Sequence, residues 1–403
     1  MDRSTADLVI VGGGIVGLTL AATWRERDPK ARIVILEKEA NSIAHGTGRN
    51  SGVLHSGIYY GTGSLRAQLC VEGQSLMKAY VSEHDLWMDP CGKLLVPTSD
   101  AACDTLPILV ERGHANGVTT ELVDAKAMLE LEPRVETRYG QALWIPSTSV
   151  VNPKAVAGHL ATRLIASGVS IRYGTPVQGI EGRDVMIPGE MIGAGAIINA
   201  AGLHADRVAE EAGLELHYSF QPFKGKYWKH HDPEFRMRRL VYPVPDLQLP
   251  FLGVHTAHNE AGEVFFGPSS TPILGRENYR GLQGLQWGDG LRLGMGLCAK
   301  LFRNTNGLRT LAWREAKLLT KSGVAAELAG LIRGVRSTDF SESLAKVGIR
   351  SQIFDPKAQR LVNDFVVIER DGVVHILNAI SPAFTASFAF ARHVIDHYLT
   401  TRE

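Results

Sequence analysis

The sequence has few cysteines and no excess of charge of either sign. Its four cysteines, at positions 70, 91, 103 and 298, form no C-x-x-C pair and no Cys/His metal spacing. This pattern fits a reducing compartment better than a disulfide framework and predicts free thiols and no metal site. The 43 Lys and Arg residues balance 42 Asp and Glu residues, so the whole chain has no field that would attract nucleic acid. Any charged site must therefore be local.

Long apolar runs are also lacking. The uncharged stretch at residues 8–24 is interrupted by three consecutive glycines, whereas a membrane-spanning helix needs about 20 mainly apolar residues. A secretory signal normally begins with net positive charge, which this chain does not have. We therefore expect a soluble, cytoplasmic protein without a cleaved leader, for which peripheral association with a membrane is a further option.

What the sequence does contain begins with a βαβ pattern. Strands are expected at 8–11 and 32–37, on either side of a helix at 15–27. Gly12, Gly14 and Gly17 stand at the junction of the first strand and the helix. The first glycine permits a tight turn, the second lets a pyrophosphate approach the backbone, and the third lets the helix pack closely on the strand.

Glu37 adds to this pattern a ligand for ribose. It closes the second strand 20 residues after Gly17, where a carboxylate can accept hydrogen bonds from the ribose of an adenine dinucleotide. A carboxylate there disfavours a 2′-phosphate, so the pattern predicts a site for FAD or NAD.

The segment GTGRNSGVLHSGIYYG at 46–61 favours FAD. An NAD-binding unit would normally continue into further alternating strands and helices, but here an irregular glycine-rich loop follows, and long loops inside domains are usually functional. Ser51 and Gly52 are small enough for their backbone to lie against a flat ring system.

Two later segments carry compatible signals. A short apolar strand ends at Ala201 and Gly202 and leads into a helix, as at many FAD sites. Near the C-terminus, a strand at 375–378 is followed by Ser381 as a predicted helix N-cap and Pro382 as the first helical residue. The positive end of that helix would stabilise negative charge on a reduced flavin.

Together these segments resemble the FAD-dependent oxidoreductase family that includes D-amino-acid, sarcosine and glycine oxidases. The segments most similar to its L-2-hydroxyglutarate dehydrogenase (oxidase) branch are GRNSGVLHSGIYY, SLRAQLCVEG, CGKLLV, AGLHADR, YPVPD, LPFLGVH, VGIRSQ and NAISPAFTAS. The sequence departs from that branch at Lys226, where an acidic residue is usual in an Arg-Gly-acidic-Tyr motif, and at Ile380 and Phe384. The departure at Lys226 leaves the exact acid substrate open.

The resemblance implies oxidation of a small L-2-hydroxy acid, with 2-hydroxyglutarate as the leading substrate and FAD as the cofactor. Such a reaction needs a carboxylate clamp, a base for the hydroxyl proton and a hydride path to the flavin. Arg350 is the candidate clamp, and His55 and His255 are the candidate bases. Further predicted substrate-binding residues are Tyr60, Tyr242 and Lys226, and further predicted cofactor-binding residues are Lys38, Arg49, Asn50 and Val177.

The predicted fold class is α/β, with a discontinuous Rossmann-like FAD-binding domain and a mixed α+β substrate domain with an antiparallel-rich sheet. The FAD-binding domain is placed at 1–88, 147–220 and 337–403, and the substrate domain at 89–146 and 221–336. Segments 91–99, 227–231, 239–245 and 262–268 read as strands of this second sheet, with an apolar helical stretch around 308–319 packed against it.

Several alternatives stay open. An amine or amino-acid oxidase on the same fold is the first rival function, and a FAD-binding partner protein without turnover is the second. The electron acceptor is oxygen, a quinone or a carrier protein. The basic segment at 224–239 is interpreted first as a solvated sheet edge and second as a guide for acidic substrates or a membrane contact.

Overall fold

Two compact units make up the protein in the computed structural model, which describes residues 2–247, 252–281, 283–284, 287–302 and 308–399. Unit 1 comprises Met1–Asn50, Pro153–Pro222 and Ile349–Glu403, and unit 2 comprises Ser51–Asn152 and Phe223–Gly348. The sequence-based domain boundaries stay a prediction. The first of them, at residue 88, lies within unit 2. Because unit 2 begins at Ser51, most of the glycine-rich segment 46–61 belongs to that unit and not to unit 1.

The secondary structure of unit 1 follows from its apolar segments. Its helices and strands are, in chain order, β1 (Asp2–Val11), α1 (Ile15–Arg27), β2 (Ile33–Leu36), α2 (Gly46–Arg49), α6 (Pro153–Ala166), β9 (Ser170–Arg172), β10 (Gly179–Glu181), β11 (Asp184–Ile187), β12 (Glu190–Asn199), η1 (Gly202–His204), α7 (Ala205–Glu211), β13 (Ser219–Phe220), β20 (Ile353–Asp355), β21 (Arg360–Leu361), β22 (Val367–Arg370), β23 (Val373–Ile376) and α11 (Ala383–Tyr398). The βαβ pattern predicted for the first 37 residues is therefore confirmed.

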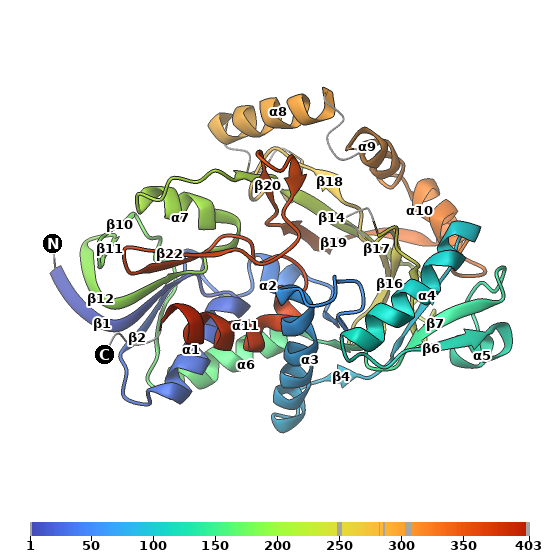
Figure 1. The fold of residues 1–403 in the computed structure, drawn as a ribbon, viewed down its shortest axis with the longest axis horizontal. Coiled ribbons are helices and arrows are strands. Elements are labelled where there is room, and N and C mark those ends of the chain that lie inside the picture. Colours follow the sequence, from blue (N-terminus) through green and yellow to red (C-terminus); the bar gives the residue numbers. More distant parts are fainter. Residues whose placement is uncertain (1, 248–251, 282, 285–286, 303–307, 400–403) are drawn as a thin grey trace. The chain divides into compact units, whose positions relative to one another are not determined.

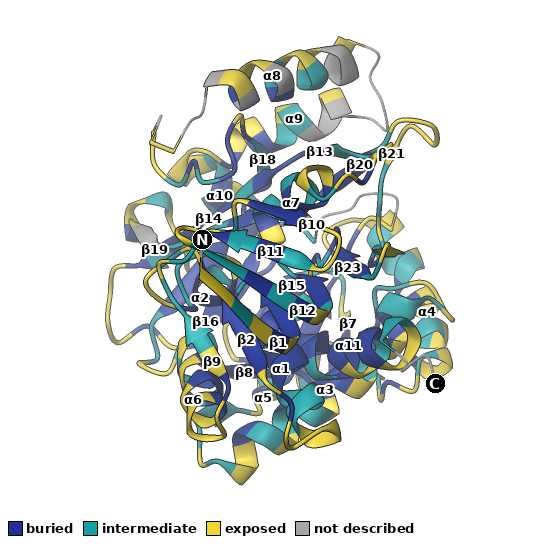
Figure 2. Ribbon diagram, turned by 90° about the vertical axis from the view of Figure 1, so that its left-hand side faces the viewer, coloured by how far each residue is buried: buried dark blue, intermediate teal, exposed yellow. Residues whose placement is uncertain are grey.

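An eight-stranded sheet is the centre of unit 1. Its main path runs β10-β11-β12-β1-β2-β9, and β23 pairs with both β12 and β22. β1 is parallel to β12 and to β2, and Val9 stands opposite Ile197 on one side and Val34 on the other. All four residues of β2 are buried, and β1 changes from exposed at its start to buried at its end (Figure 2). Continuous apolar burial is expected where helices cover a parallel sheet.

Helix α1 lies against both α6 and α11 (Figure 1). It follows the glycine turn directly and ends at Arg27. Asp28 is the C-cap with an extended backbone, as expected for a residue that precedes a proline. The buried ends of β1 and β12 and the start of α1 therefore meet at the same edge of the sheet.

Unit 2 combines several small sheets with helices. Its elements are, in chain order, β3 (Val53–Leu54), α3 (Leu65–Glu83), β4 (Met88–Asp89), β5 (Lys93–Val96), α4 (Asp100–Ala115), β6 (Glu121–Asp124), α5 (Ala125–Leu131), β7 (Gln141–Ile145), β8 (Ser149–Val151), β14 (Phe223–His230), β15 (Leu240–Pro243), β16 (His255–His258), β17 (Val264–Gly267), β18 (Thr271–Pro272), α8 (Trp287–Phe302), α9 (Leu308–Lys317), α10 (Lys321–Leu328), η3 (Ser337–Asp339) and β19 (Phe340–Arg350), whose last two residues belong to unit 1.

The strands predicted for one second sheet are strands, but they lie in different sheets. β5 and β15 belong to the order β15-β5-β7-β6, while β14 and β17 belong to the order β16-β17-β14-β18, with β19 also paired to β14. The prediction of a single sheet was wrong, because strand propensity does not specify which edges pair. The two sheets share one apolar core, in which Leu94 and Val241 join Phe266 and Phe340.

Most strand pairs of these two sheets are antiparallel, and β15 with β5 is the parallel pair among those recorded. The predicted helix around 308–319 is present as α9, which contacts β18. None of the helices in the described ranges is both long and apolar enough to span a bilayer.

Candidate functional site

The glycine turn of unit 1 has no room for side chains. Gly12 has a φ of +106°, and a Cβ there would lie 2.5 Å from the carbonyl oxygen of Ala200. A Cβ on Gly17 would lie 2.0 Å from the carbonyl oxygen of Gly12. Both positions are closed by backbone atoms, which cannot move aside as a flexible side chain can. Glycine at these two positions is therefore a requirement of the turn.

The turn leads into α1 with a glycine at the N-cap position. Gly14 has no side chain that could cap the helix, and the first helical N–H, of Ile15, donates instead to Thr47 Oγ1 at 2.9 Å. A Cβ on Gly14 would lie 3.0 Å from the same hydroxyl. A helix start that follows a glycine turn fits a bound pyrophosphate, because glycines let the phosphates approach the positive end of the helix. Thr47 was not predicted from the sequence, because nothing in a glycine-rich loop marks one hydroxyl as a partner of a distant helix.

Glu37 holds the turn from the second strand. Its Oε2 accepts from the backbone N–H of Gly13 at 2.8 Å, and its Oε1 accepts from the backbone N–H of Glu39 at 2.9 Å. Each carboxylate oxygen has two lone pairs, so these bonds orient the carboxylate and leave acceptor capacity for ribose hydroxyls. Ribose binding by Glu37 stays a prediction.

The predicted cofactor residues around α2 make local contacts. Arg49 Nε donates to the carbonyl of Ala44 at 2.7 Å, and Asn50 Nδ2 donates to the carbonyl of Thr47 at 2.7 Å. Lys38 pairs with Glu39, and its Nζ lies 3.2 Å from His45 Nε2. These contacts shape the chain between β2 and α2. A direct contact of Lys38, Arg49 or Asn50 with FAD stays a prediction.

Asn199 organises the second predicted cofactor segment. Its Oδ1 accepts from the N–H of Ala201 at 3.2 Å, and its Nδ2 donates to the carbonyl of Ala205 at 2.7 Å. These bonds bend the chain directly after β12, where Ala201 and Gly202 lie beside the glycine turn because β12 pairs with β1. Val177 packs against the apolar core of this sheet. Asn199 is fully buried and was not predicted as a site residue.

The same Asn199 side chain contacts His375, which is buried in β23. Asn199 Nδ2 lies 3.2 Å from His375 Nδ1 and donates to it when the imidazole is neutral. Burial lowers the pKa of His375 to about 4. Protonation in the folded state would remove this acceptor and leave a charge in the sheet.

We expect His375 to make the protein sensitive to acid. Its folded pKa lies below the unfolded value, so its contribution to stability is present above about pH 6.5 and is lost as the pH falls toward about 4. With FAD saturating, urea unfolding should give a free energy about 2 kcal/mol lower at pH 5 than at pH 7 from this group. His375→Gln should show a shallower pH dependence, and the exposed-residue control His114→Gln should behave as the wild type. Equal slopes for H375Q and wild type would contradict the assignment.

The predicted helix start at Ser381 and Pro382 needs a correction. α11 begins at Ala383, with Pro382 at the N-cap position and no side-chain cap. Ser381 is therefore not the N-cap and Pro382 is not the first helical residue. The reason is local geometry, since Pro382 has φ −101° and ψ 46°, which is outside the helical region. Their contact with FAD stays a prediction.

In unit 2, the loop that carries His55 is held by side chains of α3. Cys70 Sγ donates to the carbonyl of His55 at 3.3 Å, and Gln74 Nε2 donates to the carbonyl of Leu54 at 3.0 Å. His55 itself is half-buried. The backbone around His55 is therefore fixed from outside the loop.

Side chains of α4 and its C-terminal end hold the next part of the same loop. Arg112 Nη1 donates to the carbonyl of Tyr59 at 3.0 Å, and Asn116 Nδ2 donates to the carbonyls of Gly57 and Tyr60 at 3.2 Å each. The Arg66 guanidinium lies 4.2 Å from the centre of the Tyr60 ring. The supports from Arg112 and Asn116 were missed because they join positions 53 to 59 residues apart, which no local pattern reveals.

The first residues of unit 2 are the two predicted to lie against the flavin. Ser51 Oγ accepts from the N–H of Val53 at 3.3 Å, and the carbonyl of Gly52 accepts from the N–H of Val151 at 2.9 Å. Both residues thus lead into β3, where pairing with β8 orders the chain. Their contact with FAD stays a prediction.

His255 is the first residue of β16 and is 5% exposed. Its Nδ1 lies 2.9 Å from the carbonyl oxygen of Gly253. Because a carbonyl can only accept, Nδ1 carries the hydrogen and the neutral ring has its lone pair on Nε2. The ring of Tyr242 stacks on the imidazole, with centroids 3.8 Å apart and an interplanar angle of 15°. The first three residues of the segment LPFLGVH lie outside the described residues.

Lys226 lies on β14 and has partners within unit 2. Its ammonium pairs with Glu342 and lies 4.1 Å from the centre of the Trp228 ring. Lys229 on the same strand pairs with Glu263. The predicted role of Lys226 in substrate binding stays a prediction.

Arg350, the candidate carboxylate clamp, is half-buried at the end of β19. Its carbonyl accepts from the N–H of Gln352 at 3.1 Å, which turns the chain toward β20. It is counted with unit 1, whereas both candidate bases are counted with unit 2.

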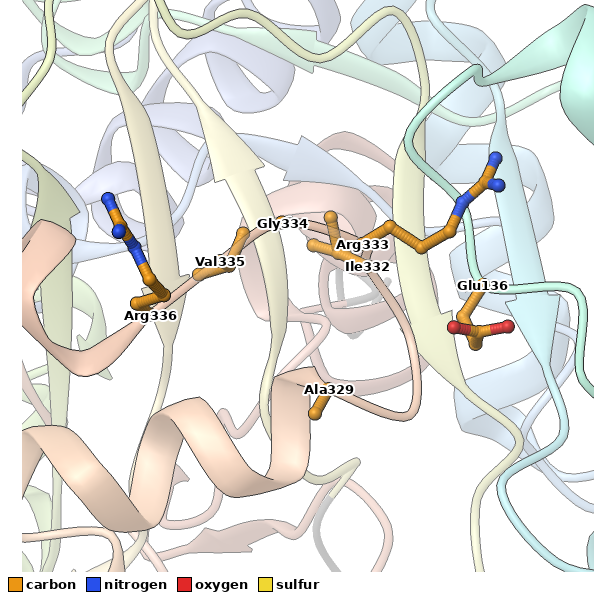
Figure 3. A pocket seen from close by; sticks show the side chains of 7 residues that line it. All are labelled: Glu136, Ala329, Ile332, Arg333, Gly334, Val335 and Arg336. Carbon is orange, nitrogen blue, oxygen red and sulfur yellow. The ribbon is translucent and has the colours of Figure 1, made fainter.

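A hollow of about 500 Å³ in unit 2 contains none of the predicted site residues. It is lined by Glu136, Ala329, Ile332, Arg333, Gly334, Val335 and Arg336. The two guanidinium groups point to opposite sides of it (Figure 3). Arg333 donates to the carbonyl of Pro133 at 2.9 Å, and Arg336 pairs with Asp339 at 3.4 Å. The two arginines that line the hollow therefore already have partners within unit 2.

The glycine turn, the start of α1 and the oriented carboxylate of Glu37 indicate a dinucleotide-binding protein. His255 in unit 2 has a fixed tautomer, which is compatible with proton abstraction in an oxidoreductase. The chain belongs to the FAD-dependent oxidoreductase family, whose family model matches residues 7–397. FAD is its cofactor, and Gly12, Gly14, Gly17 and Glu37 are the residues whose geometry fits the dinucleotide.

Similar proteins agree with this assignment over nearly the whole chain. The L-2-hydroxyglutarate dehydrogenase of Escherichia coli (strain K12) is 33% identical over 402 residues, which covers 98% of this chain and 93% of that protein. The mitochondrial L-2-hydroxyglutarate dehydrogenase of Homo sapiens is 32% identical, with coverage of 98% and 89%.

Solved structures show the same fold at lower identity. The L-alpha-glycerophosphate oxidase of Mycoplasma pneumoniae with FAD bound has a TM-score of 0.77 at 20% identity, covering 99% of this chain and 96% of that one. Glycine oxidase from Geobacillus kaustophilus has a TM-score of 0.73 at 18% identity, with the same coverage. The predicted α/β fold with a FAD-binding part is confirmed.

Proposed function

We propose that this protein oxidises L-2-hydroxyglutarate to 2-oxoglutarate. The observation that carries the proposal is the similarity, at about one third identity and over nearly the full length of both chains, to relatives named L-2-hydroxyglutarate dehydrogenase. A match that extends through both units includes the candidate base as well as the dinucleotide turn, and therefore concerns more than cofactor binding.

The reaction removes two electrons and two hydrogens from the substrate. When bound, FAD supplies the acceptor for the hydride that leaves Cα. The hydroxyl proton needs a base, and His255 Nε2 is the proposed acceptor because the Gly253 carbonyl holds the hydrogen on Nδ1. Loss of the hydride and the proton converts the C–O single bond into the carbonyl of the 2-oxo acid.

Other residues have supporting roles in this proposal. Arg350 binds a substrate carboxylate through its planar guanidinium. Tyr242 keeps the imidazole of His255 in its plane through the ring stack. His55 is the alternative base, held in place by the backbone contacts of its loop. Tyr60 and Lys226 complete the proposed substrate contacts.

The visible spectrum of the purified protein tests the function directly. We expect a flavin band at about 450 nm that bleaches on anaerobic addition of L-2-hydroxyglutarate, with 2-oxoglutarate formed and no ammonia released. D-2-hydroxyglutarate and L-glutamate are the controls. Bleaching by L-glutamate with release of ammonia would instead support an amino-acid oxidase, and bound flavin that stays oxidised with every acid would overturn the substrate assignment.

The electron acceptor is proposed to be oxygen, a quinone or a carrier protein. The same reduced protein distinguishes these, because rapid reoxidation by air with formation of peroxide identifies oxygen. Slow reoxidation by air with rapid reoxidation by a soluble quinone identifies a quinone, and slow reaction with both directs the search to a protein.

The interpretation of the basic segment at 224–239 as a solvated sheet edge was wrong for its strand β14, which pairs with β17, β18 and β19 and has five of its eight residues buried. Lys226 and Lys229 have carboxylate partners in Glu342 and Glu263, which reduces the positive charge available to a lipid surface. The protein should therefore stay in the supernatant when anionic vesicles are sedimented at low salt. Co-sedimentation that salt reverses would support a peripheral membrane contact instead.

A further inference from the structure

Lys93 is a lysine inside the core of unit 2. It is the first residue of β5, its exposed fraction is 0%, and its Nζ has no hydrogen-bond partner among the described residues. A buried ammonium without a carboxylate or a hydrogen-bond acceptor is costly. Burial lowers the pKa of Lys93 to about 7. A residue kept in such a place calls for an explanation beyond packing.

The contacts of Lys93 are aromatic rings. Its Nζ lies 4.5 Å from the centre of the Tyr59 ring and 5.1 Å from the centre of the Tyr242 ring. Both distances are within the range in which a cation is attracted to the electron-rich face of a ring. The Tyr242 ring is also the one stacked on His255, at 3.8 Å. Lys93 and the proposed base therefore contact the same aromatic side chain.

The thiols and phenols around Lys93 and Tyr242 do not change their protonation near pH 7, whereas Lys93 does. The surrounding thiols are those of Cys70, from α3, and Cys91, before β5, and burial raises the pKa of each to about 12. Burial also raises the pKa of Tyr59 and of Tyr242 well above the usual value. The remaining phenols near Tyr242 belong to Tyr60 and Tyr227.

Other charged side chains interact with the two thiols. Arg66 faces Cys70, and Asp89, Arg239 and Lys78 face Cys91. These groups interact with the thiols, and among the described residues the recorded cation contact of the Tyr242 ring is that of Lys93. The charge that changes beside that ring is the charge of Lys93.

We propose that Lys93 is a positioning residue for the oxidation, which holds the Tyr242 ring against His255 and sets the proton affinity of the imidazole. The inference rests on the proposed function, in which His255 is the base. An ammonium on the aromatic ring that stacks on the imidazole disfavours a second positive charge, so in this proposal Lys93 favours the neutral form of His255, which can accept the hydroxyl proton. Loss of the Lys93 proton at higher pH weakens both effects.

Lys93→Met tests this inference in the protein with FAD bound. Methionine is unbranched and apolar and fills most of the same space. We expect the imidazole resonance of His255, assigned by its absence in His255→Asn, to titrate with a pKa higher by about half a unit or more in K93M. The acidic limb of the kcat profile should move by the same amount, with little change in KM.

Lys78→Met is the matched control. Lys78 is also a partly buried lysine of unit 2 close to Cys91, but its ammonium bonds to the carbonyl of Ser147 and not to an aromatic ring. We expect the His255 titration in K78M to follow the wild type. A folded K93M protein with an unchanged His255 titration would overturn the proposal, and so would an equal shift in K78M.

Two features keep the test decisive. The titration needs no turnover, so a protein that does not oxidise L-2-hydroxyglutarate still answers the question about Lys93. If K93M does not fold, the wild-type titration decides: the His255 resonance should show two steps, its own and one where Lys93 loses its proton. A single step would refute the coupling.

Discussion

His255→Asn is expected to lower kcat with L-2-hydroxyglutarate by about 10²- to 10⁴-fold, the usual contribution of a positioned base. Asparagine can still donate its amide to the carbonyl of Gly253 and pack beneath Tyr242, so the fold and the flavin spectrum should be retained. What it lacks is the lone pair that Nε2 offers to the hydroxyl proton. The rate of anaerobic flavin reduction in a stopped-flow experiment measures the effect on the chemical step.

Companion variants separate the possible roles. His231→Asn, at an exposed position next to β14, is the control and should retain full activity. Arg350→Met should act mainly on KM, because the clamp binds the substrate in the ground state as well as in the transition state. If H255N keeps more than about a tenth of kcat while His55→Asn loses it, His55 is the base and the assignment of His255 is wrong.

Gly17→Ala is expected to abolish FAD binding or folding altogether. The new Cβ would lie 2.0 Å from the carbonyl oxygen of Gly12, and the only relief is to move α1 away from the turn. That movement displaces the helix start from the position that receives the pyrophosphate. We expect colourless protein, with no flavin absorption after addition of excess FAD and with a lower unfolding temperature.

Gly158→Ala is the matched glycine control. Gly158 is exposed on α6, and its new Cβ would meet no atom within 4 Å. Alanine in an exposed helix interior is more favourable than glycine by about 1 kcal/mol, so G158A should bind FAD normally and be slightly more stable. Normal FAD binding by G17A would show that the turn can open, and the proposed role of this glycine would be wrong.

The dinucleotide turn could be predicted from the sequence because its parts are neighbours in the chain. A buried apolar strand, three spaced glycines and a helix follow one another directly in the sequence, so a local pattern is enough to recognise them. The helix predicted at 15–27 is α1. The strands around Lys93, Trp228, Val241 and Phe266 were also predictable, since alternation and β-branched or aromatic residues are local signals.

The pairing of the strands in unit 2 and the first residue of α11 could not be predicted in the same way. The predicted second sheet is two sheets, because any exposed strand edge can pair and the sequence does not state which edges meet. The start of α11 lies one residue later than predicted, because the backbone of Pro382 is not helical although its residue type suits a helix start.

The sequence by itself determined the cofactor class of this protein, since the glycine spacing and the acidic residue after β2 are properties of a short continuous segment. Only the tertiary structure decided how the candidate catalytic side chains of unit 2 are held in position. The hydrogen on His255 is placed by a carbonyl, its ring by Tyr242, and the loop of His55 by side chains of α3. The burial of Lys93 beside the same ring follows from strand pairing across more than a hundred residues. Such contacts depend on which distant segments pack together, and no local pattern contains that information.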